Sequence, residues 1–115
     1  AEAIAYNKND RHILIVENNG AIANMQDDAM VEVVCELGIN GPRPMRVGNI
    51  PQFNLGLLVN QVSCEKLIVD AYFENSYQKA LEAFTLNRLI NDAKKARKVL
   101  DALIEANKGM WPELR

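Results

Sequence analysis

The spacing of hydrophobic residues changes along the chain, from strand-like periods in the first part to helix-like periods in the second. The run RHILIV at residues 11–16 is apolar after His12, which predicts a strand buried on both of its faces. From Val31 to Leu37 apolar residues alternate with polar ones, which predicts a strand with one buried face. The loop between these strands contains Gly20, which we expect to take a positive φ angle.

A hairpin is predicted after the second strand. Asn40-Gly41 supplies residues that accept the positive φ angles of a tight turn, and an apolar alternation resumes after it. Pro42 and Pro44 cannot donate ladder hydrogen bonds, so the returning strand should lie at an edge of the sheet.

The period becomes helical after Pro51, and the helix is apolar on two sides. The first side consists of Leu58, Val62, Val69 and Phe73, and the second of Leu57, Cys64, Ile68 and Ala71. Such a helix is expected to pack between two layers. A polar strip separates the two sides, and we expect it to face a subunit interface or the substrate pocket; its residues are Asn54, Gln61, Glu65 and Tyr72.

Two more helices are predicted, the first capped by Asn75-Ser76 and the second by Asn91 or Asp92. The fold class is therefore α+β: antiparallel strands including a hairpin, followed by three helices. We interpret residues 1–115 as a single domain. The chain opens in the last turns of a helix, without a Met, which suggests a fragment of a longer protein.

Composition excludes several classes of function. The chain is 49% hydrophobic and 24% charged, with a formal net charge of -2, so a nucleic acid or an anionic membrane is not the expected partner. Cys35 and Cys64 lack metal-ligand spacing, which favours free thiols in a reducing cytoplasm.

No catalytic motif stands out from the residues alone. His12 is the only histidine and has no partner at a spacing that would form a metal or acid–base site. Asp27-Asp28 is interpreted as turn chemistry rather than a cation site, because the other oxygen ligands of such a site are absent.

Three segments carry a family resemblance: NNGAIANMQDDAMVEVVCEL, NGPRPMRVGNIPQ and the helical block from VSCEKLIVDAYFE to GMWPELR. Together they resemble the C-terminal part of the family 4 glycoside hydrolases over roughly residues 9–115. AYFENSYQKALEAFTLNR and LIEANKGMWPEL are similar to the 6-phospho-α-glucosidase branch, and Asn87-Arg88 stands where much of the family has His-Pro. A weaker likeness links the strands to the C-terminal domain of lactate and malate dehydrogenases.

The resemblance implies an NAD- and divalent-metal-dependent enzyme, usually with manganese, that hydrolyses phosphorylated disaccharides such as maltose 6'-phosphate in the cytoplasm. In that chemistry NAD takes hydride from C3 of the sugar, a base removes the C2 proton, the glycosidic oxygen is eliminated, water adds, and hydride returns. The Gly-rich NAD motif, the metal-binding Cys and His segments and the tyrosine base are not found in this sequence. The resemblance thus implies an inactive piece of the substrate domain in a homo-oligomer, without the NAD-binding domain.

The sequence allows an alternative interpretation of one loop and an alternative function. The loop at Asn18-Asn19-Gly20 is predicted to be a strand connection, with Asn18 or Asn19 lining the sugar pocket of the intact enzyme as the alternative. A non-catalytic interaction or ligand-binding domain that shares the dehydrogenase C-terminal fold is the alternative to an enzyme fragment.

Overall fold

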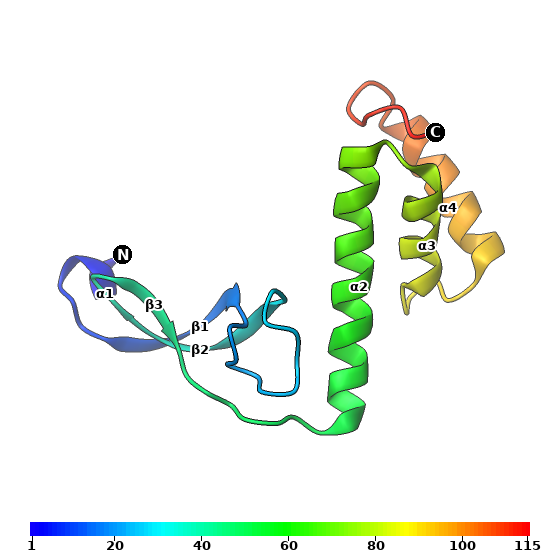
Figure 1. Cartoon of the computed structure of the whole chain (residues 1–115). Coiled ribbons are helices and arrows are strands. Elements are labelled where there is room, and N and C mark those ends of the chain that lie inside the picture. Colours follow the sequence, from blue (N-terminus) through cyan, green and yellow to red (C-terminus); the bar gives the residue numbers. More distant parts are fainter. The chain divides into compact units, whose positions relative to one another are not determined.

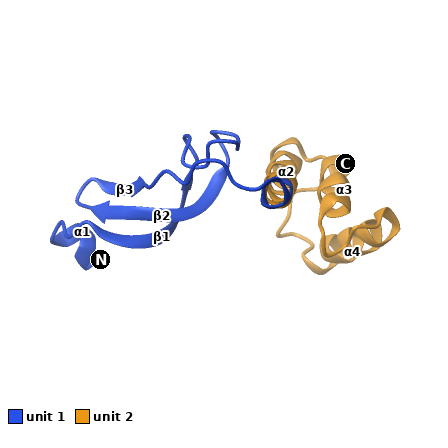
Figure 2. Cartoon of the chain, turned by 90° about the horizontal axis from the view of Figure 1, so that it is seen from below, with its two compact units in different colours: residues 1–56 blue, residues 57–115 orange.

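The computed structural model describes residues 1–115 and confirms the predicted α+β class. A short helix and three antiparallel strands are followed by three longer helices (Figure 1). Their bounds are α1 Glu2–Ala5, β1 Asp10–Glu17, β2 Met30–Gly38, β3 Gly41–Pro44, α2 Gln52–Glu74, α3 Tyr77–Leu86 and α4 Ala93–Ala106. The chain forms two compact units, here called the sheet unit (residues 1–56) and the helix unit (residues 57–115), and each is described by itself (Figure 2).

The sheet unit contains a three-stranded antiparallel sheet of order β1-β2-β3. Val31, Val33 and Cys35 of β2 are buried, while Glu32 between them is exposed, so the predicted alternation is confirmed. Helix α1 lies against β2 and buries Ala3.

The prediction that the first strand is buried on both faces is wrong for this chain. Ile13 and Ile15 of β1 are 67% and 68% exposed. The reason is topological, because β1 pairs only with β2 and lies at an edge of the sheet. An unbroken apolar run shows that a strand tends to be covered, but it does not show which part of a protein covers it.

The predicted hairpin joins β2 to β3, and β3 lies at the other edge of the sheet, as its two prolines require. Gly38 pairs with Gly41, so Ile39 and Asn40 are the turn residues. Only Gly41 takes a positive φ angle, of 87°, whereas we expected both Asn40 and Gly41 to do so. The conformational freedom needed for the turn is therefore concentrated in the glycine.

The core of the helix unit is built from small residues around one leucine. Ala71 of α2, Ala80 of α3 and Leu100 of α4 form a buried cluster. The small side chains of the cluster let the helices approach closely. The larger side chains of Tyr77 and Phe84 pack around the cluster. Side-chain caps start two of these helices, as predicted.

The caps are Ser76 and Asp92. The Ser76 hydroxyl accepts a hydrogen bond from the Lys79 N–H at 3.3 Å, and the Asp92 carboxylate accepts one from the Lys95 N–H at 2.8 Å. Each side chain satisfies a backbone donor that has no partner inside its own helix.

One apolar side of α2 is largely exposed, which differs from the predicted packing between two layers. On this side Val69 is 53% and Phe73 77% exposed, and only Val62 is buried. Cys64 and Ala71 on the other side are buried. The predicted two-sided pattern is present, but one side is covered only at Val62. No helix combines the length and apolar composition that crossing a membrane would require.

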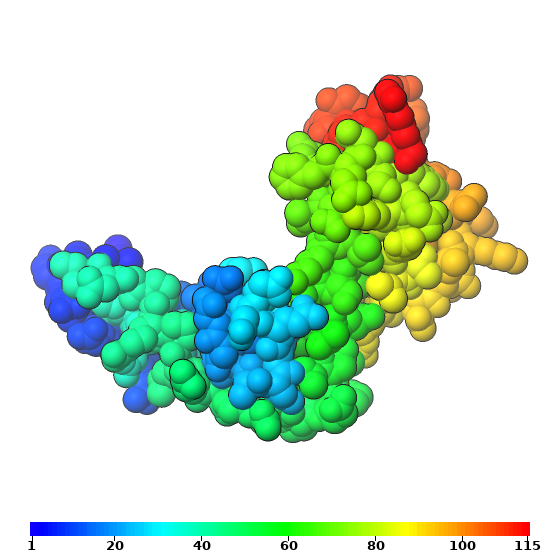
Figure 3. Space-filling view, viewed as in Figure 1, coloured from blue at the N-terminus to red at the C-terminus, as the bar shows by residue number.

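The last six residues, Met110–Arg115, form a strap that closes the helix unit. The Arg115 N–H donates to the Asn75 carbonyl at 2.7 Å, and the Arg115 carbonyl accepts from the Tyr77 N–H at 3.0 Å. Leu114 packs against the buried cluster. In the space-filling view the strap, in red, lies over the turn between α2 and α3 (Figure 3).

Candidate functional site

The connecting loop, residues 18–29, is organised around the side chain of Asn18, which is fully buried. Its Oδ1 accepts a hydrogen bond from the Ile22 N–H at 2.7 Å. Its Nδ2 donates to the carbonyl oxygens of Ile22, Met25 and Gln26 at 3.0, 3.2 and 3.0 Å. Both polar atoms of the amide are therefore used inside the loop, and the arrangement is that of a structural hub.

Asn19 has a different environment. Its side chain is exposed, and its Nδ2 donates to Glu17 Oε2 at 3.0 Å. Its φ angle is 39°, and Gly20 follows with the predicted positive φ, of 78°. Of the two candidate residues for a sugar pocket, only Asn19 has an amide that a ligand could reach.

A second asparagine, Asn24, ties the loop to the segment that precedes α2. Its Nδ2 donates to the Ile50 carbonyl at 3.0 Å, and its Oδ1 accepts from the Ile50 N–H at 3.0 Å. The Val47 N–H donates to the Ala21 carbonyl at 2.7 Å nearby. Asn24 was not among the predicted site residues, because its partner is 26 residues away and leaves no local sequence signal.

The polar strip on α2 is exposed throughout its length. Asn54, Gln61, Glu65 and Tyr72 all have accessible side chains. Gln61 Nε2 donates to Glu65 Oε1 at 2.8 Å, which is a contact within one helix. The side chains of the strip are thus accessible to a partner.

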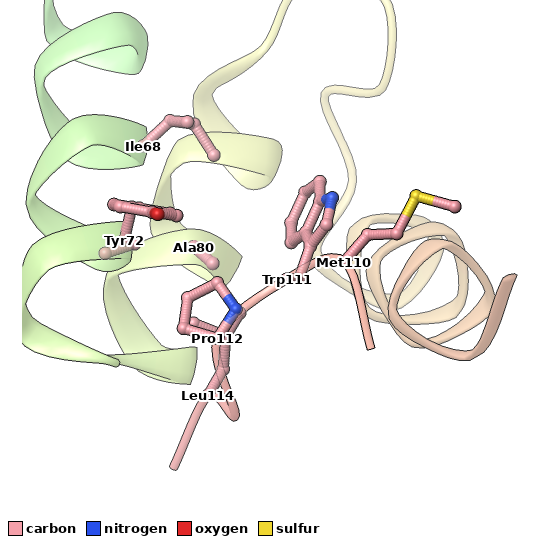
Figure 4. A pocket seen from close by; sticks show the side chains of 8 residues that line it. Ile68, Tyr72, Ala80, Met110, Trp111, Pro112 and Leu114 are labelled. Carbon is pink, nitrogen blue, oxygen red and sulfur yellow. The ribbon is translucent and has the colours of Figure 1, made fainter. Parts of the chain in front are cut away.

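The helix unit contains an apolar pocket of about 180 Å³ between α2 and the strap. Figure 4 shows Tyr72 of α2 on one side of this pocket and Trp111 and Pro112 of the strap on another. The remaining lining residues are Ile68, Ala71, Ala80, Met110 and Leu114. No carboxylate, histidine or cysteine lines the pocket, so it offers apolar contact rather than acid–base chemistry.

The residues of this chain do not fit a manganese site. His12 lies opposite Cys35 in the register of β1 and β2, but no group of three potential ligands occurs in the structure. Burial raises the pKa of the Cys35 thiol, and burial followed by the charge of Glu65 raises the pKa of Cys64. Both changes disfavour the thiolate form that binds metals.

They do not fit NAD either. A dinucleotide site needs a glycine-rich turn between a parallel strand and a helix. The strands of this chain are antiparallel, and none of its glycines follows such a strand into a helix. No step of a redox reaction is therefore assigned to these residues.

Comparison with known proteins gives matches over nearly the whole chain. Residues 1–90 match the family model described as family 4 glycosyl hydrolase C-terminal domain. The chain is 56% identical over 114 residues to maltose-6'-phosphate glucosidase of Bacillus subtilis, covering 99% of this chain and 25% of that protein. It is 52% identical over 115 residues to maltose-6'-phosphate glucosidase of Fusobacterium mortiferum, covering 100% of this chain and 26% of that protein.

Solved structures agree with these matches. A 6-phospho-α-glucosidase from gut microorganisms, in complex with NAD and Mn²⁺, is 83% identical with a TM-score of 0.96. The match covers 99% of this chain and 26% of that one. A 6-phospho-β-glucosidase from Thermotoga maritima is 28% identical with a TM-score of 0.81, over 89% of this chain and 25% of that one. The chain thus spans about a quarter of the length of the proteins that it matches.

Proposed function

Since this chain belongs to family 4 of the glycosyl hydrolases, we propose that it forms the C-terminal part of a 6-phospho-α-glucosidase that depends on NAD and a divalent metal. The family assignment inferred from the sequence is confirmed by the match to residues 1–90. Sequence identity is the observation that favours the 6-phospho-α-glucosidase branch over the 6-phospho-β-glucosidase branch. Relatives named maltose-6'-phosphate glucosidase are 52–56% identical over essentially the whole chain, whereas a probable 6-phospho-β-glucosidase is 37% identical.

The proposed activity belongs to the complete polypeptide. It is the hydrolysis of phosphorylated disaccharides such as maltose 6'-phosphate, in the cytoplasm, by the oxidation–elimination route that the family resemblance implies. A solved relative holds NAD and Mn²⁺, and another holds NAD and glucose-6-phosphate, which supports this choice of cofactors and substrate class. The residues that bind these groups are expected outside this chain, because those within it fit neither NAD nor manganese.

The role proposed for residues 1–115 is structural and positional. Both units would belong to one C-terminal domain that shapes the substrate site and makes subunit contacts, without an NAD-binding domain of its own. Asn19 is the better candidate for a contact with sugar, and Asn18 supports it by fixing the loop. The exposed strip of Asn54, Gln61, Glu65 and Tyr72 is the proposed contact with a neighbouring subunit of a homo-oligomer.

A comparison of two proteins tests this function. The full-length enzyme and the 115-residue chain would be purified and assayed with a chromogenic 6-phospho-α-glucoside in the presence of NAD and Mn²⁺. We expect turnover by the full-length enzyme, its loss when the metal is chelated, and no turnover by the chain alone. The matching 6-phospho-β-glucoside is the control substrate, and we expect it to react much more slowly.

Two results would contradict the proposal. Metal-dependent turnover by the isolated chain would show that the catalytic groups lie within it. A full-length protein that folds and binds a partner but cleaves neither glycoside would favour the alternative, a non-catalytic interaction or ligand-binding domain.

A further inference from the structure

One face of the sheet in the sheet unit is apolar and uncovered. It consists of Ile13 and Ile15 of β1 with Met30 and Val34 of β2, and is called here the outer sheet face. All four side chains are exposed. The opposite face of β2 is closed, with Val31, Val33 and Cys35 buried.

The register places these residues on the same side. Ile13 pairs with Val34, and residues that lie directly opposite each other in an antiparallel pair share a face. Ile15 lies two residues along β1 and therefore on the same side as Ile13, as does Met30 relative to Val34 on β2. The Met45 N–H donates to the Val34 carbonyl at 2.9 Å, so the half-buried Met45 extends this face towards β3.

Charged residues surround the apolar centre rather than interrupt it, with one exception. At one end of the face Arg11 lies opposite Glu36, and Glu36 forms an ion pair with Arg43. At the other end Glu17 lies opposite Met30, so both ends carry a charged rim. Glu32, opposite Ile15, is the exception and needs a cation or water beside it in any covered state. An apolar centre with a polar rim is the arrangement of protein interfaces.

We propose that the outer sheet face is covered by the rest of the same polypeptide, N-terminal to this chain in the full-length enzyme. This inference rests on the proposed function. The chain spans about a quarter of its relatives, so roughly three-quarters of such a polypeptide remains available to form the cover. A face of this kind at the edge of a sheet promotes aggregation when it is free. A covalently attached segment covers it at any protein concentration, whereas a second copy does so only when it is bound.

Two labelling measurements on the full-length enzyme test the inference. The first replaces Ile15 by cysteine and measures the rate of reaction with a maleimide. Cys35 and Cys64 are both buried, and the reaction of the enzyme without the substitution is measured and subtracted, because it includes any cysteine outside this chain. The matched control is Ile39→Cys, because Ile39 is exposed to a similar degree (64%) but lies at the hairpin turn, outside the outer sheet face. We expect Ile15→Cys to react more than about tenfold more slowly than Ile39→Cys.

The second measurement identifies the cover. The photo-crosslinking residue p-benzoylphenylalanine would replace Ile15, and the crosslinked peptides would be mapped by mass spectrometry. We expect crosslinks to residues that precede this chain in the same polypeptide. Crosslinks to residues 57–115 would show that the helix unit covers the face. A crosslinked dimer would show that a second copy of the enzyme covers it. Either result overturns the inference.

The result of the labelling and crosslinking measurements can be distinguished from the result of the glycoside assay that tests the proposed function. If the enzyme cleaves the 6-phospho-α-glucoside while Ile15→Cys reacts as fast as Ile39→Cys, the outer sheet face is free and only this inference fails. Slow labelling with the expected crosslinks supports it, whichever glycoside the enzyme prefers.

Discussion

The sheet unit and the helix unit are held together by different kinds of interaction. In the sheet unit the connecting loop is fixed by the amides of Asn18 and Asn24, whose hydrogen bonds reach from residue 18 to residue 50. In the helix unit the core is a cluster of Ala71, Ala80 and Leu100 with no polar member. One unit relies on directional bonds between particular atoms, and the other relies on apolar packing.

The difference shows how each unit should respond to substitution. A buried hydrogen-bonding group that loses its partner is no longer compensated for its lost hydration, so any replacement of Asn18 should destabilise the sheet unit. An apolar core tolerates changes that conserve its volume and suffers when a cavity is left. Four substitutions are taken here from the largest expected effect on the fold to the smallest, and the first two test this contrast directly.

Leu100→Ala should have the largest effect. Leu100 is completely buried where α4 meets α2 and α3, so its truncation leaves a cavity that the short alanines around it cannot fill. We expect the free energy of unfolding to fall by about 2–5 kcal/mol, measured by urea denaturation. Leu100→Met, which conserves volume, should cost less than about 1.5 kcal/mol.

The control for this substitution is Leu103→Ala on the same helix. Leu103 is 37% exposed, so its loss should cost clearly less. Equal losses at the two positions would mean that the cluster around Leu100 is not the core of the helix unit.

Asn18→Ala should have the next largest effect. It removes the acceptor of the Ile22 N–H and the donor to three carbonyl groups, and we expect a loss of about 2–3 kcal/mol. Asn18→Asp has nearly the same shape but places a carboxylate oxygen against those carbonyls, so it should be at least as harmful. A harmless Asn18→Asp would contradict the role of the amide as a donor.

Asn19→Ala separates structure from function in the same loop. Its exposed amide bonds only to Glu17, so we expect the melting temperature to change little. In the full-length enzyme, a large fall in turnover at unchanged melting temperature would place Asn19 in the sugar pocket. Unchanged turnover would leave the loop as a strand connection only.

Glu65→Leu should have the smallest effect on the fold, within about 0.5 kcal/mol, because Glu65 is exposed. Its proposed role is in a subunit interface, so association of the full-length enzyme, measured by analytical ultracentrifugation, should weaken. Glu82→Leu is the matched control, since Gln78 donates to Glu82 at 2.9 Å in the same helical geometry as Gln61 to Glu65. If both variants associate like the parent enzyme, the strip is an ordinary solvated groove.

Much of the fold was predictable because it depends on neighbours in the sequence. Ser76 and Asp92 cap helices within three residues, and the burial of Val31, Val33 and Cys35 follows the two-residue period of a strand. The candidate site was only half predictable. Asn18 and Asn19 are adjacent and chemically identical, yet one is a buried hub and the other is exposed, and only the path of the loop separates them.

The sequence by itself determined the order of strands and helices, their caps and the apolar sides that need cover, because each of these is set by local hydrogen bonding and by the period of side chains along the backbone. Only the tertiary structure decided the contacts between distant residues. Asn24 meets Ile50, and the Arg115 carbonyl caps the first turn of α3, through distances in sequence that no period encodes. The same holds for Ile13 and Ile15, since their exposure depends on which other part of a protein packs against them, and that is a property of the assembled fold.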